Sequence, residues 1–252
     1  MAVTQGQYGR VHVFDHFTAP DNDLTWGSGT VKVGNFGFVS VNEGSYEWTV
    51  DEANGVVAFT TDTGDNDNAC LTAGTSAPTF GNMITEARYK FNSATLGAVF
   101  HGFTETLSLA TPVMPAEFDT ATMTYNGSGG MIGAQFDTDA TTNDFRACAG
   151  DGSAATGTIR GSTNTNGIRA NETIAADEWY ITRTELWQGG HGAVWVGHKG
   201  RGLDMIAEWT GAPVTNTDLF SVVCMFENRS SAARVFEVDY LSYEAGMDWE
   251  VT

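Results

Sequence analysis

The sequence contains few cysteines and prolines and no long apolar run. Its three cysteines, Cys70, Cys148 and Cys224, are far apart among 252 residues, form no C-x-x-C pair, and each lies in an apolar, strand-like context. An odd number of widely spaced cysteines indicates buried free thiols rather than a disulfide framework. We therefore expect the protein to assemble in a reducing cytoplasm.

Targeting and membrane signals are also missing. The first residues, MAVTQGQYGRV, contain no apolar core of a secretory signal, and no apolar run approaches the length of a membrane span. Without a signal, the three N-x-[ST] sequons, at Asn126, Asn171 and Asn228, are expected to be chance occurrences. We expect no contact with a membrane.

Positive charge is scarce as well. The chain has 12 Lys and Arg against 31 Asp and Glu, which gives a formal net charge of −19. A field of this sign repels nucleic-acid phosphates, favours solubility and attracts divalent cations. This excludes direct nucleic-acid binding as the expected function, and the simplest interpretation of the charge is a well-solvated exterior.

What is present indicates an all-β protein. The 30 glycines, only 5 prolines and 41% hydrophobic residues favour many short strands, glycine-rich turns and a substantial core. We predict one antiparallel β-sandwich of the jelly-roll type spanning residues 11–252. Residues 1–10 are polar and lack acidic side chains, so we predict an N-terminal arm that either docks on an acidic partner or is simply frayed.

Alternating apolar residues and turn motifs predict the individual strands. The expected strands are residues 11–17, a loosely alternating stretch from Thr30, 46–50, 56–61, 83–91, 96–103, 131–137, 144–149, 178–186, 193–199 and 203–209. We expect strands 46–50 and 56–61 to form a hairpin through Asn54-Gly55, and strands 83–91 and 96–103 to pair with each other. The segment 104–125 has no clean period and is predicted to be a long loop or insertion, and 150–174 an exposed loop with weak strand content.

The most regular stretch runs from Leu219 to Tyr243. Its first half, LFSVVCMFE, is apolar on both faces and predicts a strand in the middle of a packed sheet. Its second half, VFEVDYLSY, places Phe236, Val238 and Tyr240 on one face and Glu237 and Asp239 on the other, so it has one wet face. The two form either a hairpin or two strands close in sequence, and Val222, Val223, Cys224 and Val238 are predicted to be buried.

The same stretch holds the sharpest candidate for catalysis. Family 16 glycosidases carry E-x-D-x-x-E or E-x-D-x-x-x-E on one strand, so that all three carboxylates lie on one sheet face at the separation that retaining hydrolysis needs. Glu237 and Asp239 match the first two positions, but Glu244 is one residue too late even for the longer form. It would point to the other face unless a bulge intervened. We therefore predict no catalytic residues and no enzyme activity.

Metal and glycan sites have weaker signals. Two acidic segments offer oxygen ligands for Ca²⁺ without the spacing of a defined calcium loop; their residues are Asp65, Asp67, Asp137, Asp139 and Asp144. The five histidines show no zinc spacing. Trp187, Trp195 and Trp209 are available for stacking on sugars, although tryptophan in a β-rich chain more often fills the core or an interface. No cofactor or metal is predicted, and Ca²⁺ and glycan binding stay open.

Four stretches together resemble a known family. They are VFDHFTA at 13–19 followed by Trp26; ACLTAG with ITEARYKF at 84–91 and AVFHGFTET at 98–106; Ile132 to Gly152; and the segment from Trp179 to Tyr243. Over most of residues 11–243 the chain resembles the concanavalin A-like jelly-roll proteins found as accessory proteins on tailed-phage heads. Similar short motifs also occur in laminin G-type modules and in family 16 glycosidases.

The resemblance implies a non-enzymatic structural protein of a virion that decorates the outer surface of the capsid. Its partners would be the major capsid protein and other copies of itself, as a homo-oligomer such as a trimer, with assembly in the host cytoplasm. The alternative is a carbohydrate-binding module of a viral fibre or spike, and the third candidate is a family 16-like glycoside hydrolase.

Overall fold

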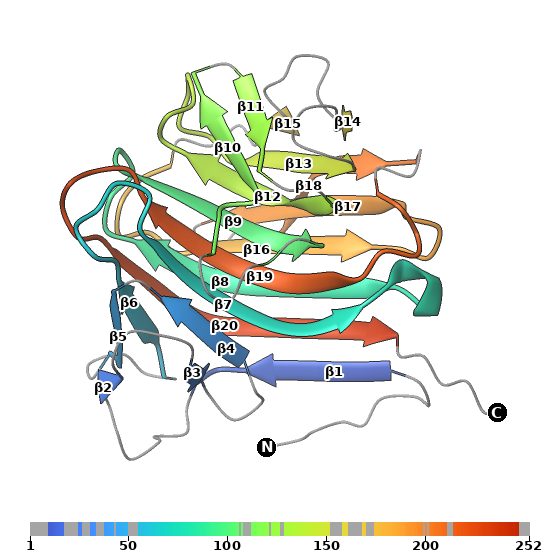
Figure 1. Cartoon of the computed structure of the whole chain (residues 1–252), viewed down its shortest axis with the longest axis horizontal. Helices are drawn as coiled ribbons and strands as arrows, with labels where there is room; N and C mark the ends of the chain where they lie inside the picture. The colour runs from blue at the N-terminus through green and yellow to red at the C-terminus, as the bar shows by residue number, and fades with distance from the viewer. Residues whose placement is uncertain are drawn as a thin grey trace.

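The computed structural model describes most of the chain. The described residues are 10–17, 25–26, 31–33, 38–42, 44–49, 55–105, 107, 112–120, 122–126, 129–151, 158–160, 168–169, 174–198, 200, 202–210 and 214–246. They form two antiparallel β-sheets packed face to face, with one further β-hairpin beside them (Figure 1). Within these residues, no helix has the length and apolar composition that crossing a membrane requires.

Sheet A contains nine strands. In spatial order they are β18 (Asp204–Trp209), β17 (Gly192–His198), β16 (Tyr180–Leu186), β8 (Met83–Phe91), β20 (Val235–Gly246), β6 (Val57–Thr60), β5 (Ser45–Trp48) and β2 (Thr25–Trp26). The ninth strand, β1 (Arg10–Asp15), pairs with the second half of β20, from Leu241 to Gly246.

Sheet B also contains nine strands. In spatial order they are β14 (Thr158–Arg160), β13 (Arg146–Asp151), β12 (Met131–Asp137), β9 (Gly97–Thr104), β19 (Phe220–Asn228), β7 (Asn68–Ser76), β4 (Phe38–Asn42) and β3 (Val31–Val33), and β15 (Ile168–Arg169) pairs with β13. The separate hairpin is β10 (Ala116–Asp119) with β11 (Thr122–Tyr125), and a short 3₁₀ helix, η1 (Pro78–Phe80), precedes β8.

The main core lies between the two sheets and is rich in aromatic rings. Phe91 stacks on Phe136 from the opposite sheet with ring centroids 5.1 Å apart, and Phe226 stacks on Phe236 at 5.4 Å. A polar side chain lies within this core: His101 of β9 contacts the hydroxyls of Thr85 and Thr182 in sheet A at 2.9 and 2.7 Å. Complete burial lowers the pKa of His101 to about 3, so the imidazole is neutral there.

A second apolar cluster covers the outer face of sheet B. Cys70, Phe100, Val223 and Met225 point away from the main core and are still fully buried, because the β10–β11 hairpin packs over them. The hairpin contributes three large side chains, from Phe118, Met123 and Tyr125, and Met114 adds a fourth from just before β10. Figure 1 shows it lying against the β12 and β13 end of this sheet. Sheet B is therefore buried on both faces over its central strands.

Several strand predictions are confirmed. β5 and β6 form the expected hairpin, with Gly55 in the left-handed region at φ 76°. The predicted strand neighbours 131–137 and 144–149 correspond to β12 and β13, and the late meander to β16, β17 and β18. Val222, Val223, Cys224 and Val238 are all fully buried. All three cysteines are free and buried as predicted.

Two predictions about pairing and sidedness are wrong. β8 and β9 do not pair, because β8 joins sheet A beside β16 and β20 while β9 joins sheet B beside β12 and β19. The segment 104–125, predicted to be a long loop or an insertion, contains the separate β10–β11 hairpin. Tyr240 does not share a face with Val238, because the register shifts at Asp239 and turns Tyr240 outward.

The structure also decides between two predicted alternatives and changes one boundary. β19 and β20 lie in different sheets, so of the two alternatives they are two strands close in sequence and not a hairpin. The predicted arm of residues 1–10 overlaps β1, which begins at Arg10; residues 1–9 lie outside the described residues. β7, which pairs with β19 in the centre of sheet B, was not predicted, because its outward-facing residues Cys70 and Thr72 are as buried as its core-facing ones.

Candidate functional site

The outer face of sheet A is the uncovered sheet surface among the described residues. On β8 the even-numbered residues from Ile84 to Lys90 are half-buried, while the odd-numbered residues are buried in the core. β16 shows the same alternation, with Ile181, Arg183 and Glu185 facing outward. This alternation arises because one face of the sheet packs against the core and the other faces solvent.

Ion pairs tie neighbouring strands together on this face. Lys90 Nζ lies 2.9 Å from Glu237, and Arg88 pairs with Asp239. Arg183 bridges Glu86 at 3.4 Å and Glu185 at 2.7 Å. The basic side chains are thus matched by carboxylates, so this surface carries little net charge although the chain as a whole is strongly acidic.

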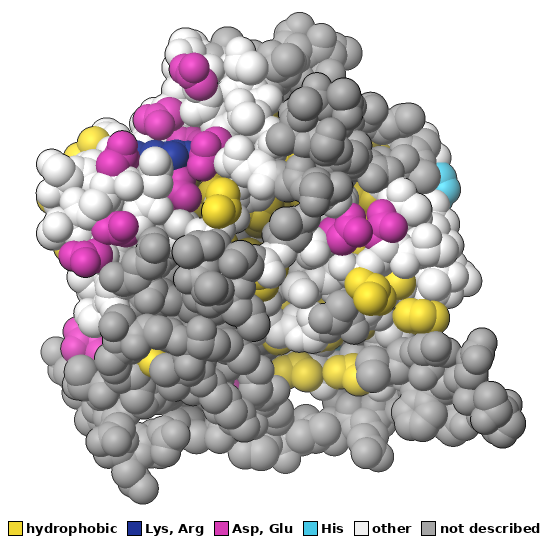
Figure 2. All heavy atoms as spheres, viewed as in Figure 1, with side chains coloured by type: hydrophobic (Ala, Val, Ile, Leu, Met, Phe, Trp, Pro, Cys, Tyr) yellow, Lys and Arg dark blue, Asp and Glu magenta, His cyan; other side chains and the backbone are white. Residues whose placement is uncertain are grey.

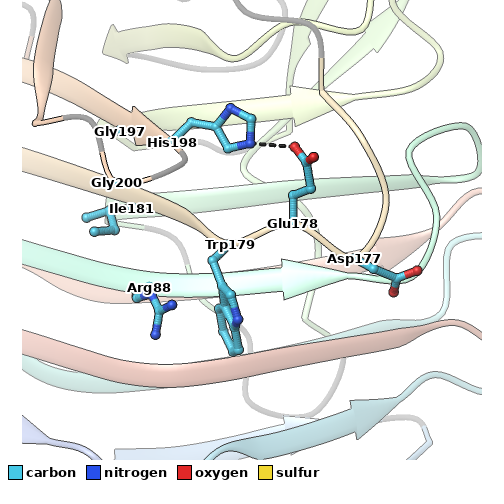
Figure 3. Close-up of a pocket in the computed structure, with 8 residues that line it drawn as sticks. All are labelled: Arg88, Asp177, Glu178, Trp179, Ile181, Gly197, His198 and Gly200. Atoms are coloured by element: carbon cyan, nitrogen blue, oxygen red, sulfur yellow. Dashed lines mark hydrogen bonds and ion pairs between the residues drawn. The ribbon is translucent and has the colours of Figure 1, made fainter.

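A pocket opens on this face where β16 begins and β17 ends. It has a volume of about 400 Å³ and is lined by Arg88, Asp177, Glu178, Trp179, Ile181, Gly197, His198 and Gly200. Figure 3 shows the Trp179 ring extending from the start of β16 toward Arg88, with Glu178 and His198 joined on the other side of the strand. Two of the lining residues are glycines, which leave room above the sheet.

The side chains of the pocket are held by contacts to the sheet. Arg88 and Lys90 lie over the Trp179 ring at 4.3 and 4.8 Å from its centroid. His198 Nε2 lies 2.5 Å from Glu178 Oε2, and the His198 ring stacks on the buried Tyr180 ring with centroids 4.5 Å apart. Because these side chains are already held in place, they would lose little conformational entropy when a ligand binds.

The loop that precedes β16 is also fixed. The backbone N–H of Asp177 donates to Phe91 O at 2.9 Å, and the N–H of Ala175 donates to the Tyr180 hydroxyl at 2.8 Å. Asp177 has a left-handed backbone at φ 59°, which aspartate tolerates better than most residues. Trp179 is therefore carried by a segment anchored to β8 and to Tyr180.

The glycosidase candidates do not assemble into a catalytic pair. Glu237, Asp239 and Glu244 are each ion-paired, to Lys90, Arg88 and Arg10 respectively. The bulge at Asp239 does turn Glu244 to the outer face, contrary to the predicted phase. However, their partners on β8, Lys90 and Ile84, are six residues apart, so the two glutamates are separated by about 20 Å. Retaining or inverting hydrolysis needs about 5–9.5 Å.

Two of the acidic residues considered for calcium, Asp137 and Asp139, meet around an arginine. Arg229 Nη2 lies 3.0 Å from Asp137, and its other nitrogens lie 2.7 Å from Glu227, 3.7 Å from Asp139 and 3.9 Å from Glu117. Figure 2 shows acidic side chains gathered around basic atoms near the β10–β11 hairpin. Among the described residues no group of His, Cys, Asp or Glu has the geometry of a metal site. Asp65 is near enough to influence Asp139, while Asp67 accepts from Gly64 N–H, and Asp144 precedes β13, which begins at Arg146.

The buried glutamate of this cluster has an unusual pKa. Glu227 is 1% exposed, and burial raises its pKa to about 8 although Arg229 opposes the shift. Burial disfavours the charged form of the Glu227 carboxyl, while Arg229, which also contacts Asp137, favours it. The cluster joins β19, β12 and the hairpin, so its role is to hold the cover on sheet B.

The three predicted tryptophans have different places. Trp209 is buried in the core, whereas Trp195 and Trp187 are partly exposed; Arg183 lies 6.0 Å from the Trp195 ring, and Trp187 Nε1 donates to Glu185. None of the three lines the pocket. Trp179, which does, was not singled out from the sequence, although it shares the phase of the outward residues Ile181 and Arg183, and this phase was a usable signal.

Comparisons with known proteins identify the fold. No protein-family model matches the chain, and no curated protein matches it. Among solved structures, a seed lectin of Lotus tetragonolobus aligns over 95% of this chain and all of its own, with TM-score 0.55 and 9% identity. The kappa-carrageenase of Pseudoalteromonas carrageenovora, solved with an oligotetrasaccharide of kappa-carrageenan, aligns over 97% and 99% with TM-score 0.53 and 11% identity.

A third structure, a protein of unknown function from Shewanella oneidensis MR-1, aligns over 94% of this chain and 87% of its own, with TM-score 0.57 and 13% identity. These identities establish the fold alone: the chain is a concanavalin A-like jelly-roll β-sandwich, as predicted. The site must be judged from its own chemistry, because one fold hosts many functions.

Proposed function

We propose that this protein binds carbohydrate, and that the pocket beside Trp179 is its sugar site. The observation that carries the proposal is a partly exposed tryptophan that lines a cavity of about 400 Å³ together with a guanidinium, two acidic residues and a histidine. An aromatic ring offers a flat apolar surface for the C–H face of a pyranose. The Arg88 guanidinium, which lies on the same side as the Trp179 ring, offers donors for its hydroxyls.

The architecture supports this choice of face. The outer face of sheet B is covered by the β10–β11 hairpin, whereas that of sheet A is open and lined with polar and aromatic side chains. The fold class is one in which a seed lectin and a kappa-carrageenase solved with an oligosaccharide are found, which agrees with the proposal. The separation of Glu237 and Glu244 favours binding without hydrolysis.

The test is a glycan array followed by calorimetry with the best neutral glycan. Trp179→Ala should weaken binding at least about tenfold, because it removes the stacking surface. The control is Trp195→Ala, the same change on the same sheet face but outside the pocket, which should leave affinity unchanged. Equal losses in the two variants, or a wild-type protein that binds no glycan, would remove the proposal. Incubation with laminarin or agarose should release no reducing ends.

A further inference from the structure

An aromatic cluster on β1 and β20 lies beside the pocket on the same face of sheet A. Phe14 stacks on Tyr240 with centroids 5.3 Å apart and an interplanar angle of 29°, and His16 meets both rings edge-on at 4.5 and 5.7 Å. Phe14 is 39% exposed, so part of its ring faces solvent beside Tyr240. The cluster is outside the pocket and plays no part in the main core.

The strand register places the pocket and the cluster in one row. Ile181 of the pocket pairs with Arg88 on β8, Arg88 pairs with Tyr240 on β20, and β1 continues beyond β20 on its far side. The row from β16 to β1 crosses three inter-strand gaps, which is about 14 Å. This length exceeds one sugar ring and matches several linked ones.

We infer that the binding site is an extended one, which holds an uncharged, linear oligosaccharide across β16, β8, β20 and β1, with Trp179 at one end and Phe14 with Tyr240 at the other. This inference rests on the proposed function, and it names the ligand class. Arg88 lies in the middle of the row and is already positioned by Asp239, so it can donate to hydroxyls between the two aromatic ends.

The electrostatics of the row select against charged sugars. Arg88 is matched by Asp239, and Lys90 by Glu237. Tyr240 donates its hydroxyl proton to Glu86 at 2.7 Å, and burial together with this carboxylate raises the pKa of Tyr240, so the phenol stays neutral. The basic side chains Arg88 and Lys90 are therefore both matched by carboxylates, and the net charge of −19 repels uronate or sulfate chains at longer range. A shallow sheet face also suits extended β-1,4-linked chains better than coiled ones.

The test measures how affinity depends on chain length. Calorimetry would compare glucose, cellotriose and cellohexaose, the chitin series from N-acetylglucosamine to chitohexaose, and hexagalacturonate as the anionic probe. In wild-type protein, one neutral series should bind at least about tenfold more tightly as the hexamer than as the monomer, and hexagalacturonate should bind more weakly than either hexamer.

Phe14→Ala should lower hexamer affinity about three- to tenfold and leave binding of the monomer unchanged, whereas Trp179→Ala should weaken both. Leu219→Ala, which removes an exposed apolar side chain that precedes β19, is the control and should change neither. If the hexamer and the monomer bind equally and only Trp179→Ala matters, the extended site is wrong while the sugar pocket stands.

Two other outcomes overturn the inference. If Phe14→Ala changes the sedimentation coefficient and leaves hexamer binding intact, the cluster is a contact between copies of this chain. If hexagalacturonate binds best, or if neither neutral series binds, the assigned ligand class is wrong. A wild-type protein that binds no glycan removes the proposed function as well. If only the extended site is wrong, the wild-type protein still binds a glycan and Trp179→Ala still weakens that binding.

Discussion

The outer faces of the two sheets have become different environments although both belong to antiparallel strands of one sandwich. On sheet A the outward residues form ion pairs such as Lys90–Glu237 and remain partly accessible. On sheet B the outward residues Phe100, Val223 and Met225 are fully buried under the β10–β11 hairpin. The difference shows that a covering element of two short strands decides which face of a β-sandwich can meet a ligand.

The charges follow the same division. On sheet A, cations and carboxylates pair near the surface, where solvent weakens each interaction. Under the hairpin, Arg229 is 6% exposed in its side chain and Asp137 is fully buried, so their pairing is surrounded by protein. We expect substitutions on sheet B to affect stability and substitutions on sheet A to affect binding.

The largest effect should come from a charge placed under the hairpin. Val223→Asp would bury an unpaired carboxylate between Phe100 and the hairpin, at a cost of several kcal/mol, and should leave little soluble protein. Ile181→Asp on the outer face of sheet A is the matched control and should fold normally. Expression yield and thermal melting measure both. A Val223→Asp protein with the wild-type melting temperature would mean that the hairpin does not cover this strand in solution.

The next effect concerns the two arginines. Arg229→Met should destabilise the fold by about 3–5 kcal/mol, because it leaves the Asp137 carboxylate buried without its partner. Arg183→Met removes ion pairs with Glu86 and Glu185 whose side chains are 16–32% exposed, and it should cost no more than about 1 kcal/mol of stability. Urea denaturation compares them directly. Equal losses would contradict the division between the two faces.

The pH dependence of stability should separate two buried groups. The pKa of Glu227 is raised to about 8 in the folded protein. Its contribution to the free energy of unfolding is therefore complete below about pH 4.5, the ordinary pKa of a glutamate, and is lost as the pH rises through 8. The pKa of His101 is lowered to about 3, so stability is complete above its ordinary pKa of about 6.5 and falls as the pH drops toward 3. Each limb has a slope of at most about 1.4 kcal/mol per pH unit.

Unfolding curves from pH 3 to 9 would test both assignments. Glu227→Gln should flatten the alkaline limb and leave the acid limb, whereas His101→Gln should do the reverse. Unchanged limbs in both variants would show that other groups control the pH dependence.

The last prediction concerns the virus particle, and it involves the smallest expected effect on the stability of the fold. The sequence resemblance predicts a copy-rich virion protein, and mass spectrometry of gradient-purified particles should find it in stoichiometric amounts. Deleting residues 2–9 should leave the thermal transition unchanged and weaken attachment if these residues dock on the capsid. Absence of the protein from particles would leave carbohydrate binding as its function outside a virion.

Much of the fold could be predicted because alternation is local. β16 and β8 show one solvent-exposed face in the sequence and in the structure, and the run LFSVVCMFE, predicted to lie in the middle of a packed sheet, corresponds to β19, which is buried on both faces. The β10–β11 hairpin was missed because strands of four residues carry too little periodicity to distinguish them from a loop. The site was missed because the outward phase of Trp179 does not show that Arg88, on a strand far away in the sequence, lies over its ring.

The sequence by itself determined that this is an acidic all-β sandwich with buried free thiols, since composition and two-residue periodicity are properties of neighbouring positions. The tertiary structure alone decided which sheet received β8 and β9, where β20 bulges, and which carboxylates would surround Arg229. Arg229 and Asp137 are 92 positions apart, and their contact depends on the whole register of sheet B. Such pairings are set by the balance of packing over all strands, which no short stretch of the chain contains.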